Sequence, residues 1–114
     1  MSELLGIARF KFHEGKLDEF KRLATRSMEI VRTKDTGTLQ YEVYLNDDQS
    51  ECIVLERYRG FEAFIEHGAH LGELGQAIVA TGSVTGACLS EPSAELRAQF
   101  AGSAIQLFTP YLSL

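Results

Sequence analysis

Polar and apolar residues alternate along two segments of the chain, residues 4–12 and residues 38–45. In the first, Phe10 and Phe12 fall on one face and basic side chains fall on the other. Successive side chains of a β-strand point to opposite faces, so strict alternation is typical of a strand with one packed face. The pattern therefore predicts a β-strand in each segment.

A helical pattern lies between these two strands. From Leu17 onward, apolar side chains recur every three or four positions, as they do on the packed side of a helix. Asp18 and Glu19 come first and Lys34 comes last, which matches the partial charges at the two ends of a helix. We predict one long helix here, closed by Gly37.

A hairpin is expected after the second strand. Residues 46–50 have turn chemistry, so residues 51–58 should return antiparallel to residues 38–45. The uninterrupted apolar run from Cys52 to Leu55 is typical of a strand that is covered on both faces. This strand is therefore predicted to lie in the interior of the sheet.

The second helical pattern, over residues 61–78, contains three glycines, Gly68, Gly72 and Gly75. Glycine weakens the interior of a helix, so we predict a weak or broken helix that is flexible beside a pocket. Residues 83–90 alternate again and predict a fourth strand.

The last part of the chain predicts two short elements. Pro92 is expected in the first turn of a helix that Gly102 ends, and residues 105–108 predict a final strand. A length of 114 residues is enough for one core and too short for two, so we expect a single domain over residues 1–114. Its core is expected at about residues 4–91, with an extension over residues 92–114.

The order of elements predicts an α+β fold of βαββαβ order. Two strand–helix–strand units in succession give an antiparallel sheet with both helices on one face. The strands carry apolar side chains on both faces, and a monomer rarely exposes an apolar patch of that size. We therefore expect a second copy of the chain to cover the bare face, with the final strand as a suitable donor to it.

The amino-acid composition limits the classes of molecule that this protein could bind. The hydrophobic fraction of 45% and the charged fraction of 24% are those of a globular protein. The net charge is −5 and no basic stripe is present, which argues against nucleic acid. The first residues lack the pattern of a signal peptide and no apolar run reaches the ~20 residues that span a bilayer, so we expect a cytoplasmic protein with no membrane partner.

The two cysteines have no chemical role in this interpretation. Cys52 and Cys88 each lie in an apolar stretch without a CxxC spacing or a neighbouring histidine. Such cysteines are typically buried and reduced.

Three short motifs resemble a known family. They are Glu14-Gly15-Lys16 followed by Phe20, the run Val54–Tyr58, and the run Phe61–His67. Together they resemble the antibiotic-biosynthesis monooxygenase-like proteins of the dimeric α/β-barrel superfamily, over about residues 4–91. The tail after Pro92 resembles an extension found in some members.

The resemblance implies a ferredoxin-like subunit, a homodimer, and a pocket between the sheet and the helices. It also implies a small apolar or aromatic ligand, because some relatives oxygenate quinol-like molecules without metal or flavin. We therefore expect a cofactor-independent monooxygenase. The alternatives are a non-catalytic dimeric domain that binds a small ligand, and an isomerase of the same superfamily. Haem degradation does not fit, since Tyr58 stands where many relatives carry Trp and the chain has no Trp.

Three residues are candidates for catalysis. His67 can act as an acid or base near neutral pH, and the alternative is that it only donates a structural hydrogen bond. Glu56, on the predicted interior strand, would have a raised pKa if it faces inward, unless Arg57, Arg9 or a hydroxyl pairs with it. The alternative is that Glu56 has a structural role, in an ion pair with a residue on the neighbouring strand. Tyr58 could donate a hydrogen bond to a substrate oxygen, or simply pack.

Three further residues are expected to contact the substrate: Phe64, His70 and Tyr41. His67 and His70 are three residues apart and share one side of the helix. With Glu66 or Glu73 they offer metal-ligand types, but no third ligand has a diagnostic spacing, so we expect no metal.

Overall fold

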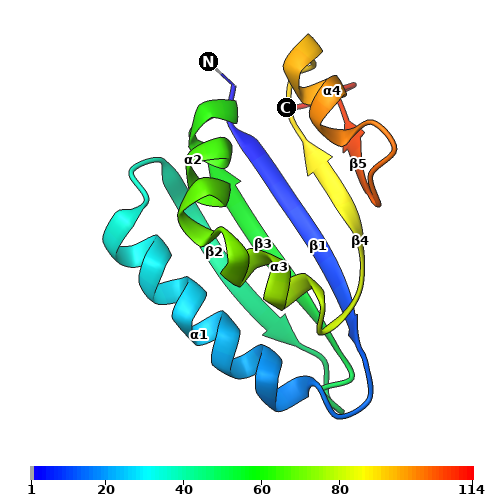
Figure 1. The fold of residues 1–114 in the computed structure, drawn as a ribbon. Helices are drawn as coiled ribbons and strands as arrows, with labels where there is room; N and C mark the ends of the chain where they lie inside the picture. Colours follow the sequence, from blue (N-terminus) through cyan, green and yellow to red (C-terminus); the bar gives the residue numbers. More distant parts are fainter. Residues whose placement is uncertain (1) are drawn as a thin grey trace.

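The computed structural model describes residues 2–114, which form one sheet with helices packed on one of its faces (Figure 1). Every predicted strand is present, and the expected α+β, ferredoxin-like fold is confirmed. The strands are β1 (Leu4–Phe12), β2 (Thr38–Leu45), β3 (Glu51–Tyr58), β4 (Gly82–Leu89) and β5 (Ile105–Phe108). The helices are α1 (Leu17–Lys34), α2 (Phe61–Leu71), α3 (Glu73–Val79) and α4 (Ala94–Phe100).

The sheet has the strand order β2-β3-β1-β4-β5, so β3 is an interior strand as predicted. The pairs among the first four strands are antiparallel, and β5 pairs parallel to β4. The final strand therefore extends the sheet of its own chain, and the expectation that it is donated to a second copy is wrong. Gly86 faces Ile105 in this added pair, and a Cβ on Gly86 would overlap the backbone of β1 at Ile7.

Helix α1 ends as its charges predict, but Gly37 does not cap it. The backbone N–H of Asp35 donates to the carbonyl of Val31 and closes the helix. Gly37 lies against Ala63 of α2, where a Cβ would have no room. The glycine is needed for this close approach of the loop to α2, not for a left-handed cap.

The second helical segment is broken, as predicted. Gly72 adopts a φ of 50° and separates α2 from α3. In the extension, Ser93 is the N-cap of α4 and its hydroxyl accepts a hydrogen bond from the N–H of Leu96. Pro92 thus precedes the helix, and its predicted place in the first turn is wrong, because a serine side chain caps the helix one residue later.

Two apolar clusters fill the space between the sheet and the helices. One lies under α1 and α3 and the other under α2 and α4. The first contains the buried residues Phe10, Phe20, Leu23, Cys52, Val54 and Ile78. The second contains Leu4, Tyr58, Cys88 and Leu96. Both cysteines are free and buried, as predicted, and burial raises the pKa of each thiol to about 11.

No helix within residues 2–114 covers the other face of the sheet. By the alternation of the strands, this outer face carries apolar side chains that include Leu5, Ile7, Ile53 and Leu55. Across residues 2–114, none of the helices has the length and apolar character needed to cross a membrane.

Candidate active site

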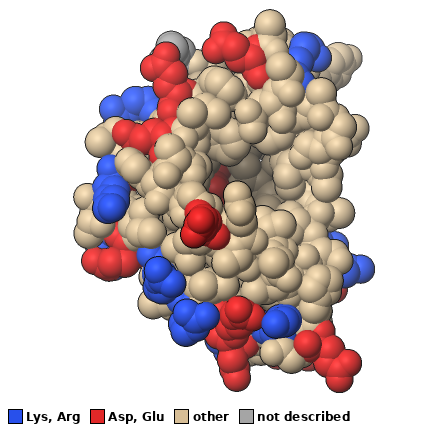
Figure 2. Space-filling model, in the orientation of Figure 1, with Lys and Arg blue, Asp and Glu red and all other residues tan. Residues whose placement is uncertain are grey.

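A cavity of about 710 Å³ lies between the sheet and the helices α2, α3 and α4. Figure 2 shows it as a hollow near the middle of the molecule, mostly uncharged, with acidic atoms visible inside. Of the described residues that line it, Glu56 is the only carboxylic acid, and none is a lysine or an arginine. The lining residues are Phe10, Tyr41, Val54 and Glu56 of the sheet, His67, Gly68 and Leu71 of α2, Gly72, then Gly75, Gln76, Ile78 and Val79 of α3, and Gln99 of α4.

The three glycines of the second helical segment all line this cavity. A Cβ placed on Gly68 would meet no described atom within 4 Å, because it would point into open space. A Cβ on Gly75 would meet only the side chain of Leu71, at 3.5 Å. The cavity therefore includes three positions of the α2–α3 segment at which glycine leaves out a side chain.

Glu56 points from β3 into the cavity. Gly6 faces it on β1 and Tyr41 faces it on β2, so the strand on one side leaves room and the other supplies a phenol. The hydroxyl of Tyr58 donates to Glu56 Oε1. Burial raises the pKa of Glu56, although the Tyr58 hydrogen bond and the nearby His67 oppose this shift. The carboxyl group of Glu56 therefore holds its proton to a higher pH than an exposed glutamate does.

The two arginines considered as partners of Glu56 lie elsewhere. Arg57 contacts Gln40 and Glu3, and Arg9 pairs with Glu51. Of the partners considered from the sequence, the hydroxyl is therefore the one present.

His67 lies at the inner end of the cavity with its side chain 6% exposed. Its Nε2 atom is 3.6 Å from Glu56 Oε1. Its ring lies between those of Tyr41 and Tyr58, with each centroid 5.3 Å away. Helix α2 and strand β3 thus bring together the three candidate catalytic residues, His67, Glu56 and Tyr58.

Asp35 is a site residue that the sequence analysis missed. Its Oδ2 atom is 2.8 Å from His67 Nδ1, its Oδ1 atom is 2.6 Å from His70 Nδ1, and Thr38 donates to Oδ2 at 2.6 Å. Burial would raise the pKa of this carboxyl group, but the hydrogen bonds from His70, Thr38 and His67 outweigh it and lower the pKa below its ordinary value. Asp35 is therefore an anion at neutral pH.

Tyr41 is tied to helix α1. Its hydroxyl oxygen is 2.7 Å from Ser27 Oγ, and the side chain of Ser27 is fully buried. Burial and the nearby Glu56 raise the pKa of Tyr41 to about 12, and burial and Glu56 also raise that of Tyr58. Both phenols are neutral donors near neutral pH.

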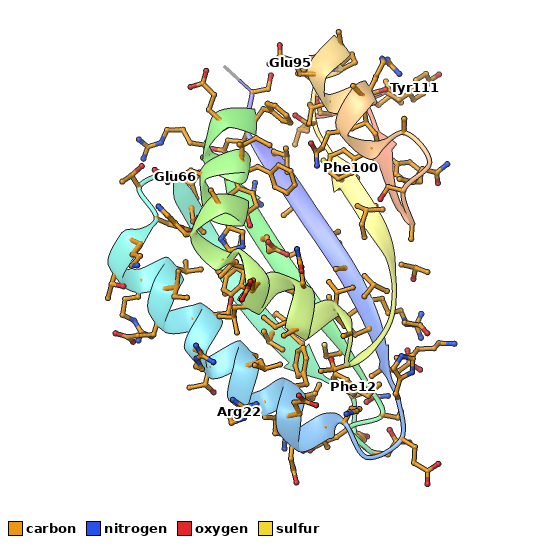
Figure 3. The ribbon with its side chains drawn as sticks, viewed as in Figure 1. Phe12, Arg22, Glu66, Glu95, Phe100 and Tyr111 are labelled. Carbon is orange, nitrogen blue, oxygen red and sulfur yellow. The ribbon has the colours of Figure 1, made fainter. Side chains whose placement is uncertain are left out.

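Phe64 and His70 lie outside the lining of the cavity. Phe64 packs edge-on against Tyr58 and also contacts Phe100, which points from α4 toward α2 (Figure 3). His70 is 28% exposed and turned toward Asp35. A substrate contact for these two residues stays a prediction, whereas Tyr41 lines the cavity directly.

Asp35, Glu66 and His70 offer ligand atoms within 4.8 Å of one another. Glu66 and His70 belong to the metal set considered from the sequence, and Asp35 replaces His67 in it. Each group already has a hydrogen-bond partner, since Glu66 accepts from Thr36 and Asp35 accepts from His70. Hydrogen bonds therefore explain how these three side chains come together.

The arrangement places an acid–base pair in a largely apolar cavity that opens to the surface. His67 Nε2 and the Glu56 carboxyl group face one region of it, and the Tyr58 hydroxyl, which does not line the cavity, bonds to Glu56. Such a site can take a proton from a bound molecule, and a ligand that fills the cavity displaces water from it.

A family model of antibiotic biosynthesis monooxygenases matches residues 5–71, more than half of the chain. The chain belongs to the antibiotic biosynthesis monooxygenase family. The matched segment contains all six site residues predicted from the sequence, and also Asp35. At the level of the family, membership supports a monooxygenase-type role. No curated protein matches the sequence.

Solved structures of low sequence identity share the fold of this family member. MupZ from Pseudomonas fluorescens is 19% identical, with a TM-score of 0.84 over 98% of this chain and 88% of MupZ. A putative antibiotic biosynthesis monooxygenase from Caulobacter crescentus is 21% identical, with a TM-score of 0.70 over 81% of this chain and 92% of its own.

A third similar structure is SnoaB, a cofactor-independent oxygenase from Streptomyces nogalater. It is 17% identical, with a TM-score of 0.64 over 75% of this chain and 89% of SnoaB. At these identities the likeness shows the fold alone. The match to MupZ spans nearly the whole chain, so it takes in the extension with α4 and β5.

Proposed function

We propose that this protein is a cofactor-independent monooxygenase that acts on a small aromatic or quinol-type compound. The observation that carries the proposal is the acid–base pair of His67 and Glu56 at the inner end of an otherwise apolar cavity of about 710 Å³. A cavity of this volume is in the range that holds a small organic ligand. The similarity to SnoaB, a cofactor-independent oxygenase, supports the reaction type.

The chemistry requires little from the protein beyond a base and a dry site. A phenol that has lost its proton can pass one electron to dioxygen, and the resulting superoxide and substrate radical can join as a peroxide anion, which takes up a proton to become a hydroperoxide. When the carbon that receives oxygen also carries hydrogen, loss of water leaves a carbonyl group. One oxygen atom is then in the product and one in water, and the substrate has supplied all the electrons.

Each candidate residue has a defined part in this scheme. His67 Nε2 takes the proton of the phenol, because this nitrogen faces the cavity beside Glu56. Glu56, with its raised pKa, orients the substrate oxygen and returns a proton to the peroxide anion, while the Tyr58 hydroxyl orients the Glu56 carboxyl group. Tyr41 donates to the substrate from the β2 side of the cavity. The apolar walls exclude water, which otherwise competes for these polar groups.

The test is oxygen uptake with a panel of substituted hydroquinones and anthrones. Wild-type protein is expected to consume oxygen with at least one of them. The rate of His67→Ala is expected to be about 10²–10⁴-fold lower, which is the usual rate enhancement from a general base. His13→Ala is the matched control, because His13 lies exposed in the turn before α1.

The outcomes separate the alternatives. Oxygen uptake that His67→Ala leaves unchanged would overturn the assignment of the base. A ligand-induced rise in melting temperature without uptake of oxygen would instead favour a binding protein. Turnover in the absence of oxygen would identify an isomerase.

The protein is further proposed to act as a homodimer in the cytoplasm, with the outer faces of two sheets packed together. The outer face carries exposed or half-buried apolar side chains, including Leu89 and Phe108, at 37% and 51% exposed. Light scattering at micromolar concentration should give twice the mass of the 12.7 kDa chain. Ile7→Glu should give the monomer, while Arg22→Glu on α1 should not. A monomeric wild type would overturn the dimer.

A further inference from the structure

Helix α2 presents two histidines to one carboxylate. His67 and His70 are three residues apart, and both direct Nδ1 at Asp35, one at each oxygen. The side chain of Asp35 is 1% exposed, and that of His70 is 28% exposed. Burial of an anion raises the free energy of the folded state unless the anion is hydrogen-bonded. These contacts therefore stabilise the buried carboxylate of Asp35.

The chemistry of a carboxylate assigns the hydrogens of both rings. An ionised carboxylate can only accept, so each Nδ1 that contacts Asp35 carries a hydrogen. In a neutral imidazole the other nitrogen then has the lone pair. For His67 that nitrogen is Nε2, which lies on the Glu56 side of the ring, 3.6 Å from Oε1.

We propose that Asp35 is the positioning residue of the site: its carboxylate holds His67 in the Nδ1–H form with the Nε2 lone pair facing the cavity, and His70 holds the second oxygen of that carboxylate. The proposal rests on the proposed function, in which His67 is the base. It adds two residues, Asp35 and His70, neither of which lines the cavity.

Three donors fix the carboxylate in place. Oδ2 accepts from Thr38 and His67, and Oδ1 accepts from His70. If His70 were lost, Oδ1 would have no hydrogen-bond donor from α2 and the carboxylate could rotate away from His67. His70 therefore acts through Asp35 on the orientation of His67.

The groups that face each histidine are few. His67 faces Asp35 and Glu56, with the rings of Tyr41 and Tyr58 on its two sides. His70 faces Asp35, and Glu66 lies in the same corner of the molecule. Since Glu66 bonds to Thr36 and not to His67, it offers a matched control carboxylate.

The direct test is the tautomer of each histidine, read from two-bond ¹H–¹⁵N correlations of the full chain without any ligand at about pH 8, where free histidine is neutral. In the wild type and in Glu66→Gln, His67 and His70 are both expected in the Nδ1–H form. An Asn at position 35 has one accepting oxygen and one donating NH₂ group, so in Asp35→Asn one ring must switch to the Nε2–H form.

The kinetic test uses whichever quinol the wild type turns over. Asp35→Ala is expected to lower kcat by about 10²–10⁴-fold, because the base is left in the wrong tautomer, and to leave KM nearly unchanged. His70→Asn places an amide N–H where Nδ1 stood and is expected to retain most of kcat, while His70→Leu is expected to lose about 10-fold, since the carboxylate keeps its other two donors.

The tautomer measurements test the role of Asp35 independently of whether the protein turns over a quinol. A wild-type His67 in the Nε2–H form, or an Asp35→Asn protein in which neither ring switches, overturns the proposal. An equal loss of kcat in Glu66→Gln and Asp35→Ala also overturns it, because the effect would then come from negative charge alone. If no quinol is turned over, the proposed function fails while the tautomers still test the role of Asp35.

Discussion

Helix α1 and the α2–α3 segment pack on the same face of the same sheet, yet one forms solid core and the other encloses a cavity (Figure 1). Helix α1 runs for 18 residues without a glycine. The α2–α3 segment is broken at Gly72, and Gly68 and Gly75 also line the cavity. The cavity therefore results from side chains that the glycines lack, and not from a missing helix or strand.

The first way to test this comparison is to remove a side chain from α1. Phe20 is 2% exposed, and its ring lies 5.6 Å from that of Phe10 and 4.7 Å from that of Phe12. Phe20→Ala should lower the free energy of unfolding by about 3–5 kcal/mol, because it removes buried contacts and leaves a void. Urea denaturation measures this, with Arg22→Ala as the control, since Arg22 is exposed on the same helix (Figure 3).

A loss below about 1 kcal/mol in Phe20→Ala would mean that α1 packs as loosely as α2–α3. The contrast between the two helical segments would then be wrong.

The second test adds a side chain to α2. In Gly68→Leu the new side chain enters the cavity, where a Cβ meets no described atom within 4 Å. Stability should be retained or rise by up to about 1 kcal/mol, because leucine favours a helix more than glycine does. Ligand binding or quinol turnover should fall by about 100-fold or more, since the space for the ligand is filled.

Ala69→Leu is the matched control for Gly68→Leu. It adds the same bulk one position later, at an exposed residue outside the cavity lining. Equal losses of activity in the two variants would mean that the helix, and not the cavity, is disturbed.

The third test concerns a point where the middle of α1 contacts the site. Ser27 is the buried polar residue of α1, and its hydroxyl is bonded to that of Tyr41. Ser27→Ala should cost about 1 kcal/mol in unfolding free energy, because the phenol loses its protein partner. Combined with Tyr41→Phe the effects should be less than additive, and a double-mutant cycle measures this coupling. Strict additivity would separate α1 from the site altogether.

The sequence was sufficient for most of the fold because its signals are local. Alternation identified β1, β2 and β4, and the glycines at 68, 72 and 75 predicted the break between α2 and α3. The partner of β5 could not be predicted, since a short strand carries no signal for its neighbour. The role of Gly37 was missed for a similar reason, because its contact with Ala63 depends on how distant segments pack.

Site residues that lie on the same strand or helix could be predicted from the sequence, and residues on separate elements could not. Glu56 and Tyr58 are two apart on β3 and so point to the same face, which alternation alone predicts. Asp35 lies 32 residues before His67, in the loop after α1, where an aspartate is an ordinary turn residue. Only the fold shows that this loop folds back beneath α2.

The smallest expected effect concerns charge, which distinguishes the cavity from the core under α1. Burial raises the pKa of Glu56, so the folded protein binds this proton more tightly than the unfolded chain does. Stability should therefore fall as the pH rises from the ordinary pKa of glutamate through the raised one, and Glu56→Gln should remove this part of the pH dependence. The contribution of Asp35 to stability depends on pH in the opposite direction. Its pKa is lowered in the folded protein, so this contribution is lost as the pH falls through the lowered pKa.

Urea denaturation midpoints, measured from about pH 4 to about pH 9, test the effect of Glu56. The midpoint of Glu56→Gln should rise relative to that of the wild type toward high pH. Glu62→Gln, at an exposed position of α2, is the control and should run parallel to the wild type. A Glu56→Gln curve that stays parallel to the wild type would mean that water reaches Glu56 freely, and the cavity would then not be the dry site that the proposed chemistry needs.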